Sequence, residues 1–229
     1  MCGLFGFISR DNETFNPKLL EQIARDTESR GPHAFGFAWV DSRNRLRMFK
    51  QRGRISDYLS LLHCARDARM LVGHCRYATH GSPSNNLNNH PHPCDGGWLV
   101  HNGVIGQCEE ISEQWNLQRV TECDSEALAL LIEELDGTLV ERCTMAIEEC
   151  ATSALAMLGL WRNPLRLVAG RSGNPLYLSK QSEGYYLASN ASAMSGAMRV
   201  KDESLLVFDQ SNGVTRMRQY DLADVMAQV

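Results

Sequence analysis

The spacing of apolar residues changes along this chain, and the changes predict an alternation of strands and helices. Residues 3–9 form an apolar run thinned by glycines, which is typical of a buried strand. After Asn16-Pro17, a common helix start, apolar residues recur at helical spacing as far as Arg30. Further strands are predicted at 34–40, 45–50, 70–75 and 98–101, and further helices at 56–66, 124–135 and 139–150.

Beyond residue 153 the pattern becomes that of β-structure. Strands separated by Gly, Asn or Pro are predicted at 154–161, 165–169, 176–179, 185–188, 205–208 and 214–220. The chain shows no internal repeat and no linker, so we expect one domain over residues 1–229, an α+β fold in which helices and sheets form layers. Residues 80–97 are predicted to be a long polar loop, and loops of this length are usually functional or disordered.

Composition narrows the class of protein. Hydrophobic residues make up 43% of the 229 residues and charged residues 22%, which is typical of a soluble globular protein. A formal net charge of -4 provides no basic surface for nucleic acid. No apolar run approaches the roughly 18–20 residues of a membrane span, and the N-terminus lacks the pattern of a secretory signal. We therefore expect a cytoplasmic protein that binds neither nucleic acid nor a membrane.

The eight cysteines include one with unusual chemistry. No two are separated by two residues, which excludes a C-x-x-C pair, and we expect seven to be reduced and mostly buried thiols. Removal of Met1 would leave Cys2 with a thiol and a free α-amine. The amine has an ordinary pKa of about 7.7–8.0 and the thiol one of about 8.5, so the amine can accept the thiol's proton. Cys2 is then a nucleophile with its own general base; the alternative is a small buried hydrophobe.

Polar groups follow several apolar strands and together suit the cleavage of an amide. The Asn102 side chain and the Gly103 N–H could stabilise an oxyanion. Arg76 could bind a carboxylate through its planar fork, and Asp124 could bind an ammonium. A substrate with these groups is glutamine or asparagine. Each residue also has a structural interpretation: Arg76 as an ion-pair partner, Asn102-Gly103 as a turn and Asp124 as a helix N-cap.

Histidines are concentrated in one part of the sequence and raise the question of a metal. Five of the seven lie between residues 74 and 101. The best zinc candidate is His90-Pro91-His92-Pro93-Cys94, yet its spacing matches no standard zinc finger. We therefore expect no metal and no cofactor.

Seven short motifs carry a resemblance to a known family. They are Met1-Cys2-Gly3 with Phe5-Gly6, Arg30-Gly31-Pro32 with Gly36, residues 73–81, Asn89-His90-Pro91-His92, Val100-His101-Asn102-Gly103, Cys123-Asp124-Ser125-Glu126 and residues 171–176. In this order they resemble the class II glutamine amidotransferases, whose glutaminase domain is an N-terminal nucleophile hydrolase. The closest resemblance is to the glutaminase domain of glucosamine-6-phosphate synthase, and the motifs span most of the chain.

The resemblance implies a fold, an enzyme activity and a nucleophile. The family fold is a four-layer αββα sandwich, and the activity is hydrolysis of L-glutamine to glutamate and ammonia. Cys2 is similar to the nucleophile that forms the γ-glutamyl thioester. Asn102 and Gly103 are similar to the family's oxyanion hole.

The resemblance also implies how glutamine is bound. Arg76 is similar to the residue that binds the glutamine carboxylate, assisted by Thr79 and His80. Asp124 is similar to the partner of the glutamine α-amine. Tyr77 departs from the pattern, since the sugar-phosphate enzyme typically has Trp there, so the loop that closes over glutamine is expected to pack differently.

Partners and alternatives follow from the family's domain organisation. Full-length members carry a synthase domain that receives ammonia, and the sequence shows only the glutaminase part, so we expect a separate synthase or amide-acceptor subunit. The first alternative is a free-standing amidohydrolase of another γ-glutamyl amide. The second is a non-catalytic domain that binds glutamine for regulation. The sequence leaves a homo-oligomer open and does not identify the ammonia acceptor.

Overall fold

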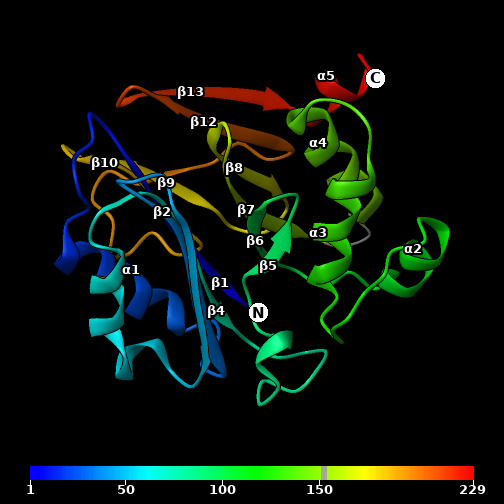
Figure 1. Ribbon diagram of the computed structural model, residues 1–229, viewed down its shortest axis with the longest axis horizontal. Coiled ribbons are helices and arrows are strands. Elements are labelled where there is room, and N and C mark those ends of the chain that lie inside the picture. The colour runs from blue at the N-terminus through cyan, green and yellow to red at the C-terminus, as the bar shows by residue number, and fades with distance from the viewer. Residues whose placement is uncertain (151–153) are drawn as a thin grey trace.

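Two antiparallel β-sheets form the centre of the structure, a computed structural model that describes residues 1–150 and 154–229 (Figure 1). The seven strands of the first sheet are β1 (Gly3–Ser9), β2 (Ala34–Asp41), β3 (Leu46–Arg52), β4 (Ala68–Arg76), β9 (Tyr177–Lys180), β10 (Gly184–Ala188) and β11 (Met198–Arg199). Their order is β11-β9-β10-β1-β4-β2-β3. Strand β1 is therefore central, and all of its residues are buried.

The second sheet packs against the first. Its six strands are β5 (His92–Cys94), β6 (Gly97–Asn102), β7 (Leu155–Arg162), β8 (Leu165–Ser172), β12 (Ser204–Ser211) and β13 (Val214–Asp221). Their order is β13-β12-β8-β7-β6-β5. Apolar side chains of both sheets, such as Leu4 of β1 and Leu158 of β7, form the core between them.

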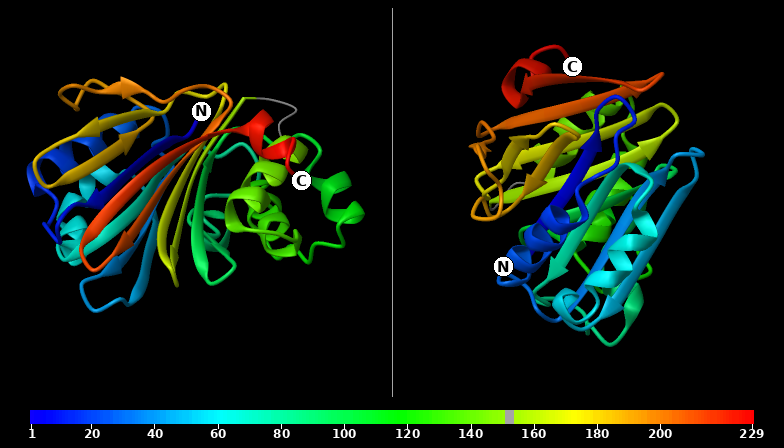
Figure 2. Two further views of the ribbon diagram at one scale, coloured as in Figure 1. Left: turned by 90° about the horizontal axis from the view of Figure 1, so that it is seen from above. Right: turned by 90° about the vertical axis from the view of Figure 1, so that its left-hand side faces the viewer.

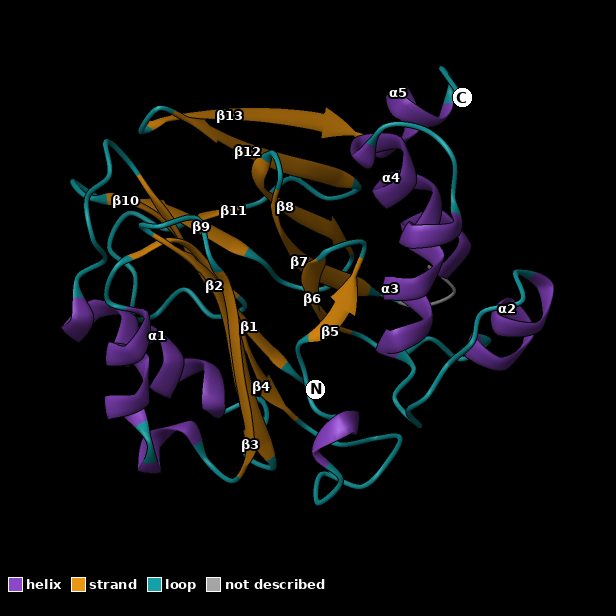
Figure 3. Cartoon of the chain, viewed as in Figure 1, coloured by secondary structure: helices purple, strands orange, loops and turns teal. Residues whose placement is uncertain are grey.

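Helices cover the two outer faces, as Figures 2 and 3 show. The helices are α1 (Pro17–Glu28), α2 (Cys108–Gln114), α3 (Ser125–Glu134), α4 (Leu139–Cys150) and α5 (Leu222–Met226), with short 3₁₀ helices η1 (Ile55–Asp57), η2 (Leu59–Ala65) and η3 (Asn86–Asn88). Apolar residues of α1, η1 and η2 pack on the first sheet, and those of α3 and α4 pack on the second. The four-layer αββα sandwich implied by the sequence resemblance is therefore confirmed. Within the described residues, no helix is long and apolar enough to cross a membrane.

Strand pairing brings the start of β1 to the end of β4. Gly3 pairs with Cys75, so Cys2 lies beside the point where β4 ends and Tyr77 begins the following loop. The turn after α1 also reaches this point. A Cβ atom at Gly31 would lie 2.4 Å from the carbonyl carbon of Arg76, so only glycine permits this close approach. The Arg30-Gly31-Pro32 motif is therefore required to pack the chain against the end of β4.

Most predicted elements are present, and two expectations need correction. The helix predicted at 56–66 is wrong, because the segment forms η1 and η2 with a break at Tyr58, whose φ of -135° is not helical. The long loop predicted at 80–97 contains η3 and the short strand β5. Helices α2 and α5 and the strands β5 and β11 were not expected from the sequence.

Candidate active site

Cys2 directly precedes the central strand β1 and lies next to the end of β4. Its Sγ accepts a hydrogen bond from the Tyr77 N–H at 3.4 Å and lies 3.5 Å from the Tyr77 carbonyl oxygen. The Arg30 Nε–H donates to the Cys2 carbonyl oxygen at 2.9 Å and so fixes the Cys2 backbone. With Met1 in place the Cys2 nitrogen is a peptide nitrogen, and the Met1 side chain is exposed.

Two opposing effects act on the Cys2 thiol. Burial favours the neutral thiol and raises its pKa above the ordinary value. The Tyr77 hydrogen bond, the N-terminal ammonium and the Arg76 guanidinium act in the opposite direction, whereas the Asp124 carboxylate adds to the rise. Burial has the larger effect, so a general base close to the sulfur is needed to generate the thiolate near neutral pH.

Asn102 ends β6 with a buried side chain whose amide nitrogen and oxygen both lack a hydrogen-bond partner among the described residues. A buried amide left without partners costs about 1–3 kcal/mol, so such a group is expected to bind a ligand or water. The end of β6 meets the end of β4, since His74 Nε2 of β4 lies 3.0 Å from the His101 carbonyl oxygen. The amide thus lies at the same end of the sandwich as Cys2.

Asn174, which lies within the motif at residues 171–176 and has no role predicted from the sequence, holds the backbone at Asn102 in place. Its Nδ2 donates to the carbonyl oxygens of Asn102 and Ala154, both at 2.8 Å. Gly103 follows, and a Cβ there would lie 2.6 Å from His101 Nε2 and 2.9 Å from the Ala154 oxygen. A larger residue would displace these neighbours, so glycine keeps the backbone close to them.

Arg76 is buried at the end of β4 and holds the loop that follows. Its Nη1 donates to Asn89 Oδ1 at 2.9 Å, and its Nη2 donates to the carbonyl oxygens of His80 and of Gly81, the latter at 3.1 Å. None of the ion pairs within the described residues includes Arg76. The ion-pair interpretation of Arg76 is therefore wrong for a protein carboxylate, and the charge of this buried guanidinium is balanced only by neutral oxygens among the described residues.

The residues that directly follow Arg76 are more exposed. Thr79 and His80 are exposed. Tyr77 is 45% exposed, and its ring packs against His33 with the centroids 4.8 Å apart. His33 also accepts a hydrogen bond from the Ala78 N–H at 3.0 Å, so it anchors the start of the loop. The structure places Thr79 and His80 next to Arg76 in the chain but gives them no contact with Cys2.

Asp124 is buried just before α3 and connects this helix to the Gly103 segment. Its Oδ2 accepts a hydrogen bond from the Ile105 N–H at 2.8 Å. Asp124 is the N-cap residue of α3, as the sequence suggested, but its side chain makes no capping hydrogen bond to the helix. The second carboxylate oxygen lies 3.5 Å from Ser125 Oγ and 3.8 Å from Cys123 Sγ, which are weak contacts. This oxygen is the atom with which Asp124 could bind a ligand ammonium.

Known proteins with similar sequences indicate the family of this chain. No protein-family model matches it. The glutamine–fructose-6-phosphate aminotransferase of Bacillus thuringiensis is 32% identical over 224 residues, which cover 92% of this chain and 35% of that protein. The same enzyme of Shouchella clausii is 29% identical over 100% of this chain and 38% of its own length. The chain belongs to the class II glutamine amidotransferases. It spans a little over a third of the length of these relatives.

Solved structures of other amidotransferases support the fold. The glutamine phosphoribosylpyrophosphate amidotransferase of Bacillus subtilis superposes with a TM-score of 0.79 at 21% identity. The superposition covers 96% of the present chain and 49% of the Bacillus subtilis chain. A glutamine aminotransferase class-II domain protein from Silicibacter pomeroyi gives a TM-score of 0.65 at 14% identity, covering 96% and 99% of the two chains. At these identities the similarity shows a shared fold.

Proposed function

We propose that this amidotransferase domain hydrolyses L-glutamine to glutamate and ammonia, with Cys2 as the nucleophile. The observation that carries the proposal is the unpartnered, buried amide of Asn102 at the same end of the sandwich as the Cys2 thiol. In this interpretation the described residues form a glutaminase domain. Arg76 binds the glutamine carboxylate, with Thr79 and His80 from the adjacent loop, and Asp124 binds the α-amine.

The proposed reaction begins with removal of Met1, which frees the Cys2 amine. That amine takes the proton of the thiol, and the sulfur attacks the side-chain carbonyl carbon of glutamine. The oxyanion accepts hydrogen bonds from Asn102 Nδ2 and the Gly103 N–H. Collapse of the intermediate expels ammonia, which carries the transferred proton, and leaves a γ-glutamyl thioester. Water then hydrolyses the thioester, so glutamate and the free thiol are the products.

The relatives' names suggest where the ammonia goes. The aminotransferases are named for fructose-6-phosphate as acceptor, and this chain matches about a third of their length. We infer that the ammonia passes to a synthase domain or to a separate acceptor subunit. Co-purification with an acceptor enzyme, and a rise in glutaminase activity when that enzyme is present, would support this part of the proposal.

The experiment that tests the glutaminase proposal compares two cysteine variants. Intact-mass measurement first establishes whether Met1 is removed, and ammonia release from glutamine is then assayed. Cys2→Ala should abolish ammonia release and leave the fold intact, whereas Cys64→Ala, at an exposed thiol of η2, should keep full activity. Unchanged activity in Cys2→Ala, or an active protein that retains Met1, contradicts the mechanism. A panel of γ-glutamyl amides tests the alternative of an amidohydrolase, which would prefer one of them to glutamine.

A further inference from the structure

Four histidines are buried together between β4, β5 and β6, and several of their ring nitrogens have no partner. His90 has no hydrogen-bond partner at either nitrogen within the described residues, and His92 has none at Nε2. The rings of His74 and His90 stack with their centroids 3.8 Å apart, and those of His90 and His92 are in edge contact at 4.7 Å. Buried imidazole nitrogens without partners are costly, and the glutaminase mechanism gives His90 and His92 no role.

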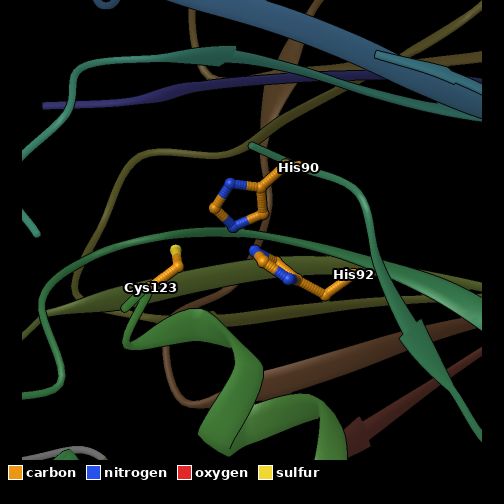
Figure 4. A group of neighbouring side chains, drawn as sticks. All are labelled: His90, His92 and Cys123. Carbon is orange, nitrogen blue, oxygen red and sulfur yellow. The ribbon is translucent and has the colours of Figure 1, made fainter. Parts of the chain in front are cut away.

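A cysteine far away in the sequence completes this cluster. Cys123 follows 31 residues after His92, yet Figure 4 shows its thiol facing the His90 and His92 rings. One donor atom from each of the three residues lies within 4.8 Å of the other two, and all three residues are buried. In tetrahedral zinc sites the metal lies about 2.0–2.1 Å from nitrogen and about 2.3 Å from sulfur, so two nitrogens and one sulfur are separated by roughly 3.3–3.6 Å. Side-chain movements that shorten these separations by at most about 1.5 Å would bring the three donors to that spacing.

We propose that His90, His92 and Cys123 bind one zinc ion, with water as the fourth ligand. Two imidazoles and one thiolate form a donor set that suits zinc better than calcium or magnesium, which prefer oxygen. On binding, the Cys123 S–H bond breaks, its proton leaves to solvent and a zinc–sulfur bond forms. The Asp124 carboxylate, 3.8 Å from Cys123 Sγ, partly balances the remaining positive charge.

The ion would connect two segments that flank the proposed glutamine site. His90 follows Asn89, whose side chain accepts a hydrogen bond from Arg76, and Cys123 precedes Asp124. Zinc would therefore hold the loop after β4 and the start of α3 in a fixed relation. This inference goes beyond the proposed glutaminase reaction and does not depend on it.

The cysteine of the proposed zinc site is Cys123 and not Cys94, which is closer to the histidines in the sequence. Cys94 lies two residues after His92, but its thiol contacts the Ala129 carbonyl oxygen of α3 at 3.3 Å. Cys94→Ser is therefore a matched control for Cys123→Ser, because both replace a buried thiol close to the histidines. Cys2→Ser serves as a second control, because it removes the proposed nucleophile and leaves the three donors His90, His92 and Cys123 in place.

The test measures zinc binding without any activity assay. The full chain is stripped with a chelator and titrated with zinc against a chromophoric competitor, and then with cobalt in place of zinc. Wild type, Cys94→Ser and Cys2→Ser should bind one equivalent and show a thiolate-to-cobalt charge-transfer band. Cys123→Ser should bind at least about tenfold more weakly and lack the band. Zinc should also raise the Tm of wild type but not that of Cys123→Ser.

Several results would overturn the proposal. They are a wild type that binds no zinc, a Cys123→Ser variant with wild-type affinity, and loss of the cobalt band in Cys94→Ser or Cys2→Ser. If Cys123→Ser does not fold, His92→Gln takes its place and should show the same loss of affinity. A glutaminase that is active but binds no zinc would refute only this proposal, and a zinc-binding protein without glutaminase activity would refute only the other.

Discussion

Replacement of Asn174 by alanine tests how the Asn102 segment is held. The variant loses two hydrogen bonds of 2.8 Å, to the carbonyl oxygens of Asn102 and Ala154. At about 0.5–1.5 kcal/mol for each bond, the free energy of unfolding should fall by about 1–3 kcal/mol. For a domain of this size, each kcal/mol lowers the Tm by roughly 2–4 °C.

The same change should lower activity beyond its effect on stability. Without Asn174 the Asn102 carbonyl is unanchored, and a shift of about 1 Å in a catalytic group can lower kcat about 100-fold. We expect kcat for glutamine hydrolysis to fall roughly 10–100-fold, with little change in KM because Arg76 and Asp124 are untouched. Steady-state kinetics of ammonia release, together with thermal unfolding, measure both effects.

A matched variant separates geometry from stability. The buried Gln210 amide also donates two hydrogen bonds, to the Ser9 oxygen at 3.0 Å and to Thr215 Oγ1 at 3.1 Å, at the far end of β1 from Cys2. The Gln210 side-chain oxygen also accepts a hydrogen bond from Arg69 Nε at 2.7 Å, so Gln210→Ala should lose at least as much stability but keep its kcat. If Asn174→Ala also keeps its kcat while losing stability, Asn174 is purely structural and the reasoning about the oxyanion site is refuted.

Two further predictions concern binding and acid stability. Arg76→Lys should raise KM for glutamine at least tenfold, about 1.4 kcal/mol, because the planar fork is lost; Arg216→Lys is the surface control, and an unaltered KM would remove Arg76 from the site. Burial alone would raise the pKa of Asp41, but hydrogen bonds from Arg45 and Arg47 outweigh it and lower that pKa from 3.8 to about 2. The stability from Asp41, about 2 kcal/mol, is therefore present above pH 3.8 and is lost as the pH falls towards 2. Asp41→Asn should show a smaller acid loss in urea unfolding, and an equal loss would contradict this.

The elements with strong apolar periodicity were predicted well, because their sequence and their burial agree. The strand at 3–9 and the helix that begins at Pro17 match β1 and α1 closely. The helix predicted at 56–66 failed because Tyr58 leaves helical geometry, and its ring stacks on Phe35 at 5.7 Å. Helix α2 was missed because its polar sequence contains few apolar positions to mark a period.

Some residues of the candidate site could be predicted from local sequence motifs, whereas others come together only through tertiary packing. Motifs indicated Cys2, Asn102 and Asp124 because each follows or precedes an apolar element. The partnership of Cys123 with His90 could not be read from the sequence, since it depends on how α3 packs beside β5. A strand rises about 3.3 Å per residue, so His92 and Cys94 are about 6.6 Å apart along β5, and the Cys94 thiol contacts the Ala129 carbonyl oxygen of α3 instead.

The candidate site lies between two sheets whose strands, over residues 1–150 and 154–229, pair only within their own sheet. Cys2 and Arg76 belong to one sheet, and Asn102 belongs to the other. Leu158 of β7 projects towards Gly6 of β1, where an added Cβ would be only 3.3 Å from its Cδ1. Side-chain packing of this kind sets the separation of the Cys2 thiol and the Asn102 amide, so we expect substitutions of buried residues far from any ligand to change that separation. The core residues between the two sheets therefore determine the distance between Cys2 and Asn102 as well as the stability of the fold.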